Sequence, residues 1–129
     1  MKKIIPFLMA LLLLTGCGAQ SEGSTYCQIN AEEAATMMEE ESSHIILDVR
    51  TVQEYSEKHI PGAINIPNET IGDQDIPELP DKEQLILVYC RSGNRSKQAS
   101  AKLVKLGYTN IVEFGGINGW TGESVSGEA

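Results

Sequence analysis

The sequence predicts an α/β domain built on a parallel sheet. Apolar runs typical of buried strands alternate along the chain with segments of helical spacing; the run over residues 85–89, for example, is followed by a helical pattern from about residue 94. The chain of 129 residues leaves room for one compact domain, and it contains no internal repeat. We therefore expect a single domain over residues 26–122.

Two predicted helices in the first half of this domain begin with recognisable N-terminal capping residues. Asn30 can cap a helix from residue 31 to about residue 41. Thr51 and Glu54 have the spacing of a capping box, which predicts a short helix ending near Lys58. Around these helices the sequence predicts strands over residues 26–29, 44–49 and 63–66, with a turn over 59–62.

The second half begins with a loop over residues 67–82, which contain four prolines or glycines, five acidic residues and room for one helical turn. A helix is expected from Asn94 or Arg95, and Gly107 is suited to the position after its end. The remaining predicted elements are strands over 85–90 and 108–113, a short helix over 117–121 and a disordered tail over 123–129.

The N-terminus resembles an export signal. A basic start is followed by an apolar stretch over residues 4–14, which is shorter than the roughly 20 apolar residues of a membrane-spanning helix. The sequence Leu14-Thr15-Gly16-Cys17 is similar to the bacterial lipobox, in which the chain is cut before a cysteine that is then lipidated. Residues 1–16 are thus predicted to be a lipoprotein signal peptide. The alternative is an ordinary signal peptide cleaved nearby, which leaves Cys17 free or in a disulfide.

Cleavage there predicts an acidic protein held at the outer face of the cell membrane by lipid on Cys17. Small polar residues over 17–25 form the lipidated N-terminus and a flexible tether. Loss of the two signal lysines lowers Lys and Arg from 10 to 8 against 18 acidic residues, a formal net charge of −10. This charge argues against nucleic-acid partners and against a polybasic membrane-binding surface.

Cys90 is the strongest candidate for a functional residue. It ends the strand-like run and opens a turn into the next helix, where unsatisfied backbone N–H groups and the helix dipole favour a thiolate. The nearby Arg91, Arg95 and Lys97 carry more than a third of the mature protein's positive charge. Cys90 is therefore predicted to be a nucleophile.

The three cysteines are too few for a disulfide framework. If Cys17 carries lipid, Cys27 and Cys90 remain as thiols. A reactive thiol outside the membrane must be kept reduced or carry a group, so a thiol-redox protein is a possible partner. Cys27 could resolve Cys90 as a disulfide, but no spacing brings the two together, and we expect Cys27 to be a half-buried strand residue without that role.

Four motifs occur in a fixed order: Asp48-Val49-Arg50 with Glu54-Tyr55, then His59 to Pro67, then Cys90 to Ser96, then Gly115 to Trp120. Together they resemble the motifs of single-domain rhodaneses, over about residues 27–121. The resemblance implies a mostly parallel five-stranded sheet with helices on both faces. It also implies a sulfurtransferase that needs no metal or cofactor, in which Cys90 takes a sulfane sulfur from an anion such as thiosulfate and passes it to cyanide or a thiol.

The turn after Cys90 is expected to bind the donor. It can curl so that several backbone N–H groups point at the sulfur, stabilising a thiolate and then a persulfide. Arg95 is the better candidate for framing the loop; its alternative is to pair with a nearby acid from the first helical turn. Arg91 is expected to orient the donor or to lie solvated at the rim. The substrate-binding set is Arg91, Ser92, Gly93, Asn94 and Arg95.

Other polar and aromatic residues in these motifs favour structural roles. Asp48 and Arg50 lie near the active edge of the sheet, where Asp48 is expected to accept backbone N–H bonds or pair with an arginine; a direct catalytic part is the alternative. His59 lies in a turn with no second residue spaced to bind a metal, so local hydrogen bonding is expected. Trp120 is expected to pack the last turn onto the domain.

Two other functions remain open at this point. A persulfide carrier, or a redox or partner-binding module, could use the same cysteine without turning over small donors. Related phosphatases of the Cdc25 type have five residues between cysteine and arginine, and here four separate Cys90 from Arg95, so a phosphatase or arsenate reductase is the weaker alternative.

Overall fold

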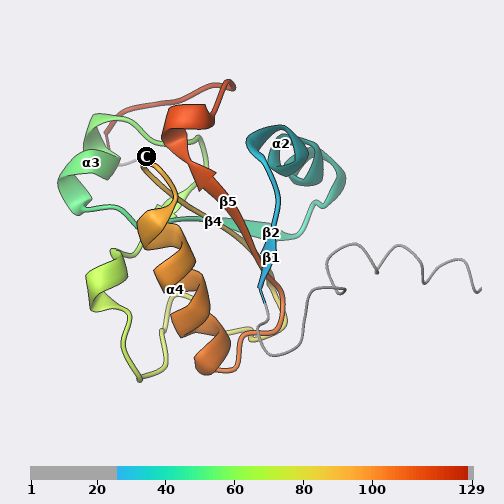
Figure 1. Cartoon of the computed structure of the whole chain (residues 1–129), viewed down its shortest axis with the longest axis vertical. Helices are drawn as coiled ribbons and strands as arrows, with labels where there is room; N and C mark the ends of the chain where they lie inside the picture. The colour runs from blue at the N-terminus through green and yellow to red at the C-terminus, as the bar shows by residue number, and fades with distance from the viewer. Residues whose placement is uncertain (1–25, 128–129) are drawn as a thin grey trace, which may run out of the picture.

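The computed structural model describes residues 26–127, which form a five-stranded sheet with helices on both faces (Figure 1). The strand order is β1-β5-β4-β2-β3, and every neighbouring pair is parallel, which confirms the predicted α/β class. The strands are β1 (Cys27–Gln28), β2 (His44–Asp48), β3 (Ile64–Asn65), β4 (Leu85–Cys90) and β5 (Ile111–Gly116). The helices are α2 (Ala31–Glu40), α3 (Val52–Glu57) and α4 (Asn94–Lys105), with short 3-10 turns η1 (Asn68–Thr70) and η2 (Ile117–Gly119).

The predicted N-terminal caps of α2 and α3 are both present. Asn30 caps α2 through a reciprocal bond with Glu33. Thr51 and Glu54 form the predicted capping box of α3, in which each side chain satisfies a backbone N–H of the other. Such boxes depend on residues three positions apart, so the sequence alone locates them.

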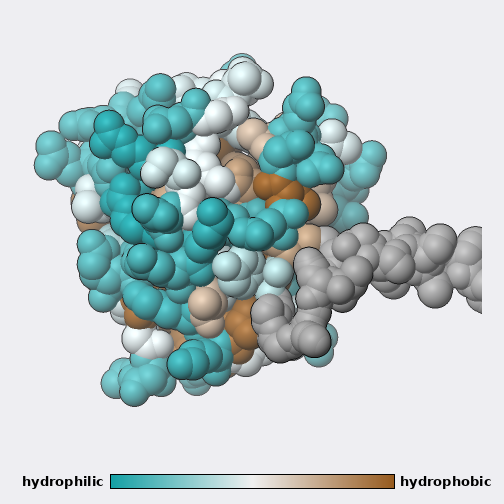
Figure 2. Space-filling model, viewed as in Figure 1, coloured by the Kyte–Doolittle hydropathy of each residue, from teal (hydrophilic) through white to brown (hydrophobic). Residues whose placement is uncertain are grey.

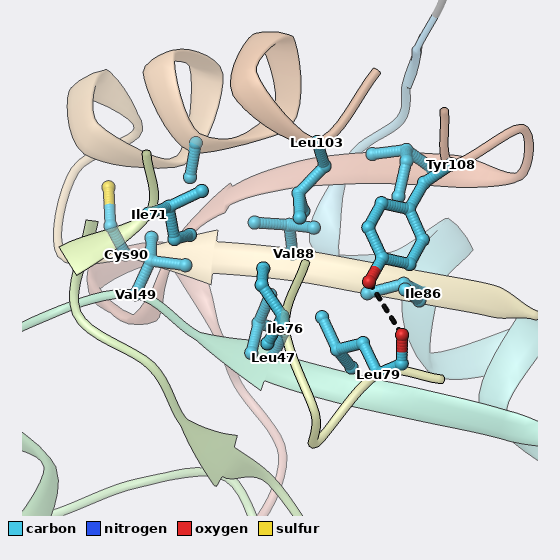
Figure 3. Close-up of a cluster of buried hydrophobic side chains, with 12 residues drawn as sticks. Leu47, Val49, Ile71, Ile76, Leu79, Ile86, Val88, Cys90, Leu103 and Tyr108 are labelled. Carbon is cyan, nitrogen blue, oxygen red and sulfur yellow. Dashed lines mark hydrogen bonds between the residues drawn. The ribbon is translucent and has the colours of Figure 1, made fainter. Parts of the chain in front are cut away.

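The sheet separates two apolar cores. Ala99 and Leu103 of α4 pack on one face, against Val88 of β4, while Ala34 of α2 packs on the other with Leu87. Because side chains alternate along a strand, Cys90 shares the face of Val88. Figure 3 shows the Cys90 sulfur on this side, and Cys90 belongs to the same buried cluster as the residues that pack beneath α4.

The outer side of α4 is hydrophilic, as expected for a helix that buries one stripe (Figure 2). Lys97, Gln98 and Lys105 are exposed on it. Among the described residues no helix is long and apolar enough to cross a membrane. The predicted signal peptide and tether, residues 1–25, lie outside the described residues.

The last strand is displaced from its predicted position. The last strand was expected over residues 108–113, but β5 spans Ile111–Gly116. Tyr108 instead packs into the core, where its hydroxyl donates to the Leu79 carbonyl (Figure 3). At the other end, Gly116 continues the pairing with Cys90 across a register shift. The strand is as long as predicted but lies three residues later, and this shift brings the Gly115–Gly116 pair against the loop over residues 91–95, the active loop.

The predicted disordered tail is wrong for residues 123–127. Val125 forms an antiparallel bridge with His59, with two backbone hydrogen bonds of 2.8 Å, and Gly127 N–H donates to the Ser56 carbonyl at 2.8 Å. The chain after η2 therefore returns to the end of α3 (Figure 1). Its backbone groups are satisfied by this bridge, which no local sequence pattern indicates.

Candidate active site

Cys90 lies where β4 ends and the loop to α4 begins. Cys90 is only 1% exposed to solvent, and its Sγ accepts a hydrogen bond from the Gly93 N–H at 3.0 Å. Gly93 is the residue before α4 and has a φ of +112°, a left-handed conformation that glycine adopts without a Cβ penalty. The chain thus turns sharply enough to point an N–H back at the sulfur.

The expected ring of several backbone donors around the sulfur is only partly present. Of the backbone N–H groups in residues 26–127, that of Gly93 is the one bonded to Cys90 Sγ. The second polar contact is a side chain, Ser96 Oγ, at 3.5 Å. Because the Ser96 hydroxyl lies beside the sulfur, a residue outside the predicted substrate-binding set contributes directly to this site.

Two glycines on β5 let the active loop pack against the sheet. A Cβ added to Gly116 would lie 2.0 Å from the Arg91 carbonyl oxygen, and Gly115 Cα is 3.6 Å from the Cβ position of Gly93. The Arg91 carbonyl also accepts the Asn118 N–H at 3.2 Å. The Gly-Gly pair therefore sets the height of the loop above the sheet.

Sequence reasoning missed Glu113, a buried carboxylate next to this loop. Ser96 Oγ donates to Glu113 Oε2 at 2.5 Å, and Gly115 N–H donates to the same oxygen at 2.9 Å. Ser96 is fully buried and Glu113 is 2% exposed. An acidic residue between Val112 and Phe114, in an otherwise apolar strand, was the available signal.

The two arginines of the loop share one acidic partner. Arg95 forms a bidentate pair with Glu54 of α3, at 2.8 and 3.1 Å. Arg91 lies 3.6 Å from the same carboxylate, with its side chain 63% exposed. The Arg95 hydrogen bonds, with support from the Thr51 N–H and against the effect of burial, lower the pKa of Glu54 to about 2.

For each arginine the structure shows the second of the two roles considered from the sequence: Arg95 pairs with an acid, and Arg91 lies in solvent at the rim of the loop. Arg95 lies on the first turn of α4 and pairs with an acid, and this pair ties the loop to α3. Arg91 lies at the solvated rim, and Ser92 and Asn94 are also exposed. Of the predicted substrate-binding residues, Gly93 is the one in contact with the sulfur.

Asp48 and Arg50 form a buried structural pair. Arg50 Nη2 lies 2.6 Å from Asp48 Oδ2 and also donates to the Lys58 carbonyl at 2.6 Å. Tyr89 donates its hydroxyl to Asp48, and burial together with the Asp48 charge raises the Tyr89 pKa. The Asp48 side chain is thus held by Arg50 and Tyr89, and the expected pairing of Asp48 with an arginine is confirmed.

His59 and Trp120 also have the structural roles predicted for them. His59 Nδ1 is 2.8 Å from the Tyr55 carbonyl oxygen, and its ring stacks on the Tyr55 ring with centroids 3.8 Å apart. Trp120 packs beside Phe114 and donates its indole N–H to the Glu123 carbonyl at 2.8 Å. Within residues 26–127 no three His, Cys, Asp or Glu side chains are placed to hold a metal ion.

Cys27 differs from its prediction as a thiol. It lies on β1, 8% exposed, and is disulfide-bonded. Cys90 is consequently the free cysteine of the described residues.

A shallow hollow of about 190 Å³ opens beside the active loop. Its walls include positively and negatively charged groups, such as the Arg91 guanidinium and the Glu54 carboxylate. A space of this size suits a small anion or the end of a thiol side chain. The lining residues are Arg50, Glu54, Glu57, Lys58, Arg91, Ile117 and Asn118.

Comparison with known proteins identifies the family to which this fold and loop belong. The family model of the rhodanese-like domain matches residues 30–123. The chain belongs to the rhodanese-like family. Thiosulfate sulfurtransferase PspE of Escherichia coli (strain K12) is 38% identical over 71 residues, which are 55% of this chain and 68% of that protein.

Two further relatives align over a larger share of this chain or over the whole length of the relative. The putative sulfur carrier protein YrkF of Bacillus subtilis (strain 168) is 29% identical over 107 residues, 82% of this chain and 57% of that protein. A solved structure described as rhodanese with anions, from E. coli, has a TM-score of 0.61 and 34% identity, covering 66% of this chain and all of that one. This rhodanese domain is therefore similar both to a named thiosulfate sulfurtransferase and to a putative sulfur carrier protein.

Proposed function

We propose that this protein is a sulfurtransferase that moves a sulfane sulfur from thiosulfate or a similar anion to a thiophilic acceptor through a persulfide on Cys90. The observation that carries the proposal is the hydrogen bond from Gly93 N–H to the Cys90 sulfur at the N-terminus of α4. A backbone donor and a helix dipole both stabilise negative charge on sulfur. The name of the E. coli relative supports thiosulfate as donor.

The reaction is a double displacement that needs only the thiolate. Cys90 Sγ attacks the outer sulfur of thiosulfate, a new S–S bond forms, and sulfite leaves with the electrons of the broken S–S bond. Cyanide or a thiolate then attacks the outer sulfur of the persulfide, and Cys90 leaves as a thiolate. The Gly93 N–H faces sulfur in each state.

Arg91 is the better placed of the two arginines to bind the donor. It is exposed, borders the hollow and is only loosely held at 3.6 Å from Glu54. Arg95, by contrast, is fixed by its bidentate pair with Glu54. We infer that Arg91 turns toward the anion while Arg95 keeps the loop in place.

The decisive test is intact mass after exposure to thiosulfate. The wild-type protein should gain one sulfur atom, and Cys90→Ala should gain none. Purified protein should also form thiocyanate from thiosulfate and cyanide. A wild-type protein with neither the adduct nor turnover would refute the proposal.

A sulfur carrier is the second candidate, favoured by the near-complete burial of Cys90 and by the resemblance to YrkF. It predicts a stable Cys90 persulfide that passes to a protein thiol and resists cyanide. Rapid cyanide turnover would exclude it. If the protein were a phosphatase or an arsenate reductase, it would hydrolyse an aryl phosphate or reduce arsenate in a reaction that depends on Cys90. Absence of both activities in the wild-type protein would exclude that alternative.

We also propose that the protein is anchored on the extracytoplasmic side of the cell membrane by lipid on Cys17. The lipobox-like sequence before Cys17 supports this location. The protein should fractionate with membranes, and Cys17→Ala should release or mislocalise it.

A further inference from the structure

A buried hydrogen-bonded chain leads from the reactive sulfur into the sheet. The Cys90 thiol donates to Ser96 Oγ at 3.5 Å, and the Ser96 hydroxyl donates to Glu113 Oε2 at 2.5 Å. All three residues are at most 2% exposed. The chain therefore joins a thiol to a carboxylate with almost no access to water.

Ser96 has one proton and several acceptors, so its geometry decides where that proton lies. Its Oγ is 3.1 Å from the Gly93 carbonyl oxygen and 3.3 Å from that of Gly115, both longer than the contact with Glu113. The proton therefore lies toward Glu113, and a lone pair of Ser96 Oγ is left for the Cys90 thiol.

We propose that Glu113 accepts the Cys90 thiol proton through the Ser96 hydroxyl. The inference rests on Cys90 being the nucleophile of the proposed function. The S–H proton moves to Ser96 Oγ while the Ser96 proton moves to Glu113 Oε2, and the electron pair of the S–H bond stays on sulfur. One negative charge passes from the carboxylate to the sulfur, so the net charge of the buried site does not change.

The groups around this chain favour an exchange within it. Tyr26 faces Glu113 from the β1 side, and burial and the Glu113 charge raise its pKa, which keeps it neutral. On α4, Arg95 faces Cys90 and Lys97 Nζ lies beside Gly93. These cations stabilise the charge once it reaches the sulfur. Within residues 26–127, the donors that hydrogen-bond to Glu113 are neutral, including the Gly115 N–H at 2.9 Å.

The test is the pH profile of Cys90 alkylation in Glu113→Gln, which keeps the shape of the side chain but cannot take up a proton at neutral pH. At pH 6 we expect the alkylation rate to fall by about a hundredfold, the lower end of general-base effects, and to recover at high pH. The profile thus shifts to higher pH. Ser96→Ala should shift it in the same direction.

A purely electrostatic or structural role predicts a different result. Removing a nearby negative charge by itself favours the thiolate and moves the profile to lower pH. A downward shift, or none, in Glu113→Gln therefore overturns the proposal. Ser100→Ala is the matched control: Ser100 is buried one turn further along α4, its hydroxyl has no partner in the described structure, and the profile should not move.

Wild-type infrared difference spectra cover the case in which Glu113→Gln fails to fold. At neutral pH the wild type should show a protonated carboxylic acid band and no S–H band, and the acid band should be absent from Cys90→Ala, which has no thiol proton to give to Glu113. An S–H band at neutral pH without the carboxylic acid band refutes the relay. These measurements use no sulfur donor, so failure to load sulfur from thiosulfate counts against the proposed function alone.

Discussion

Glu54→Gln tests whether one carboxylate holds the active loop to α3. Glu54 accepts two hydrogen bonds from Arg95 and caps its own helix through Thr51 N–H. The fall of its pKa from 4.5 to about 2, due chiefly to Arg95, corresponds to about 3 kcal/mol at about 1.4 kcal/mol per tenfold change in proton affinity. Glutamine keeps the capping contact, and Arg95 is partly exposed, so we expect a loss of about 2 kcal/mol at pH 7.

The pH dependence distinguishes an ion pair from simple packing. Because folding lowers the pKa of Glu54, its stabilising effect is fully present above about pH 4.5 and is lost as the pH falls through about 2. The difference in unfolding free energy between wild type and Glu54→Gln should therefore shrink over this interval.

Urea unfolding followed by the fluorescence of Trp120, the single tryptophan, measures this difference directly. Glu57→Gln on the same helix is the control, because Glu57 is exposed; it should change stability by less than about 0.5 kcal/mol. A difference for Glu54→Gln that stays constant from pH 7 to pH 2 would refute the ion-pair explanation, as would no difference at pH 7.

Three further substitutions test other parts of the site. Arg91→Gln should lower kcat/KM for thiosulfate by about tenfold, the value of one charge-assisted hydrogen bond, while alkylation of Cys90 by a neutral reagent stays unchanged; equal loss in both assays contradicts a donor-binding role. Gly116→Ala should displace the loop, destabilise the protein by about 1–3 kcal/mol in urea and slow sulfur loading, whereas Gly119→Ala, with open space around it, should do neither. Tyr89→Phe should cost about 1–3 kcal/mol in thermal or urea unfolding, because it leaves two buried hydrogen-bonding groups without the hydroxyl; a neutral result would show that the network relaxes.

The parts of the fold that sequence predicted are those with local causes. The caps of α2 and α3, and the place of Cys90 between a strand and a helix, depend on residues a few positions apart. Pairings between distant elements were not predictable in this way. Glu54 and Arg95 are 41 positions apart, and Ser96 and Glu113 are 17 apart, so their contacts follow from how α3, α4 and β5 pack.

The donor-binding loop shows the same limit. The two arginines after Cys90 predicted a site that binds anions. No sequence pattern near them indicated that Glu54 would lie against both side chains. The bridge between His59 and Val125 is likewise a tertiary contact, which is why a polar, glycine-containing end of the chain was expected to be disordered. Each difference arises from a partner on another element.

The charges around Cys90 show why the position of one proton matters for an anionic substrate. Arg91 and Arg95 together exceed the charge of Glu54 by one, which balances a thiolate before a dianionic donor arrives. If Glu113 were ionised at the same time, a second negative charge would lie about 6 Å or less from the sulfur, since both groups contact Ser96 Oγ. At an effective dielectric constant of about 20 that repulsion is about 3 kcal/mol. In the relay we propose, the proton held on Glu113 removes this repulsion at the step where thiosulfate adds two more negative charges, so the buried carboxylate and the two arginines both limit the negative charge at the site.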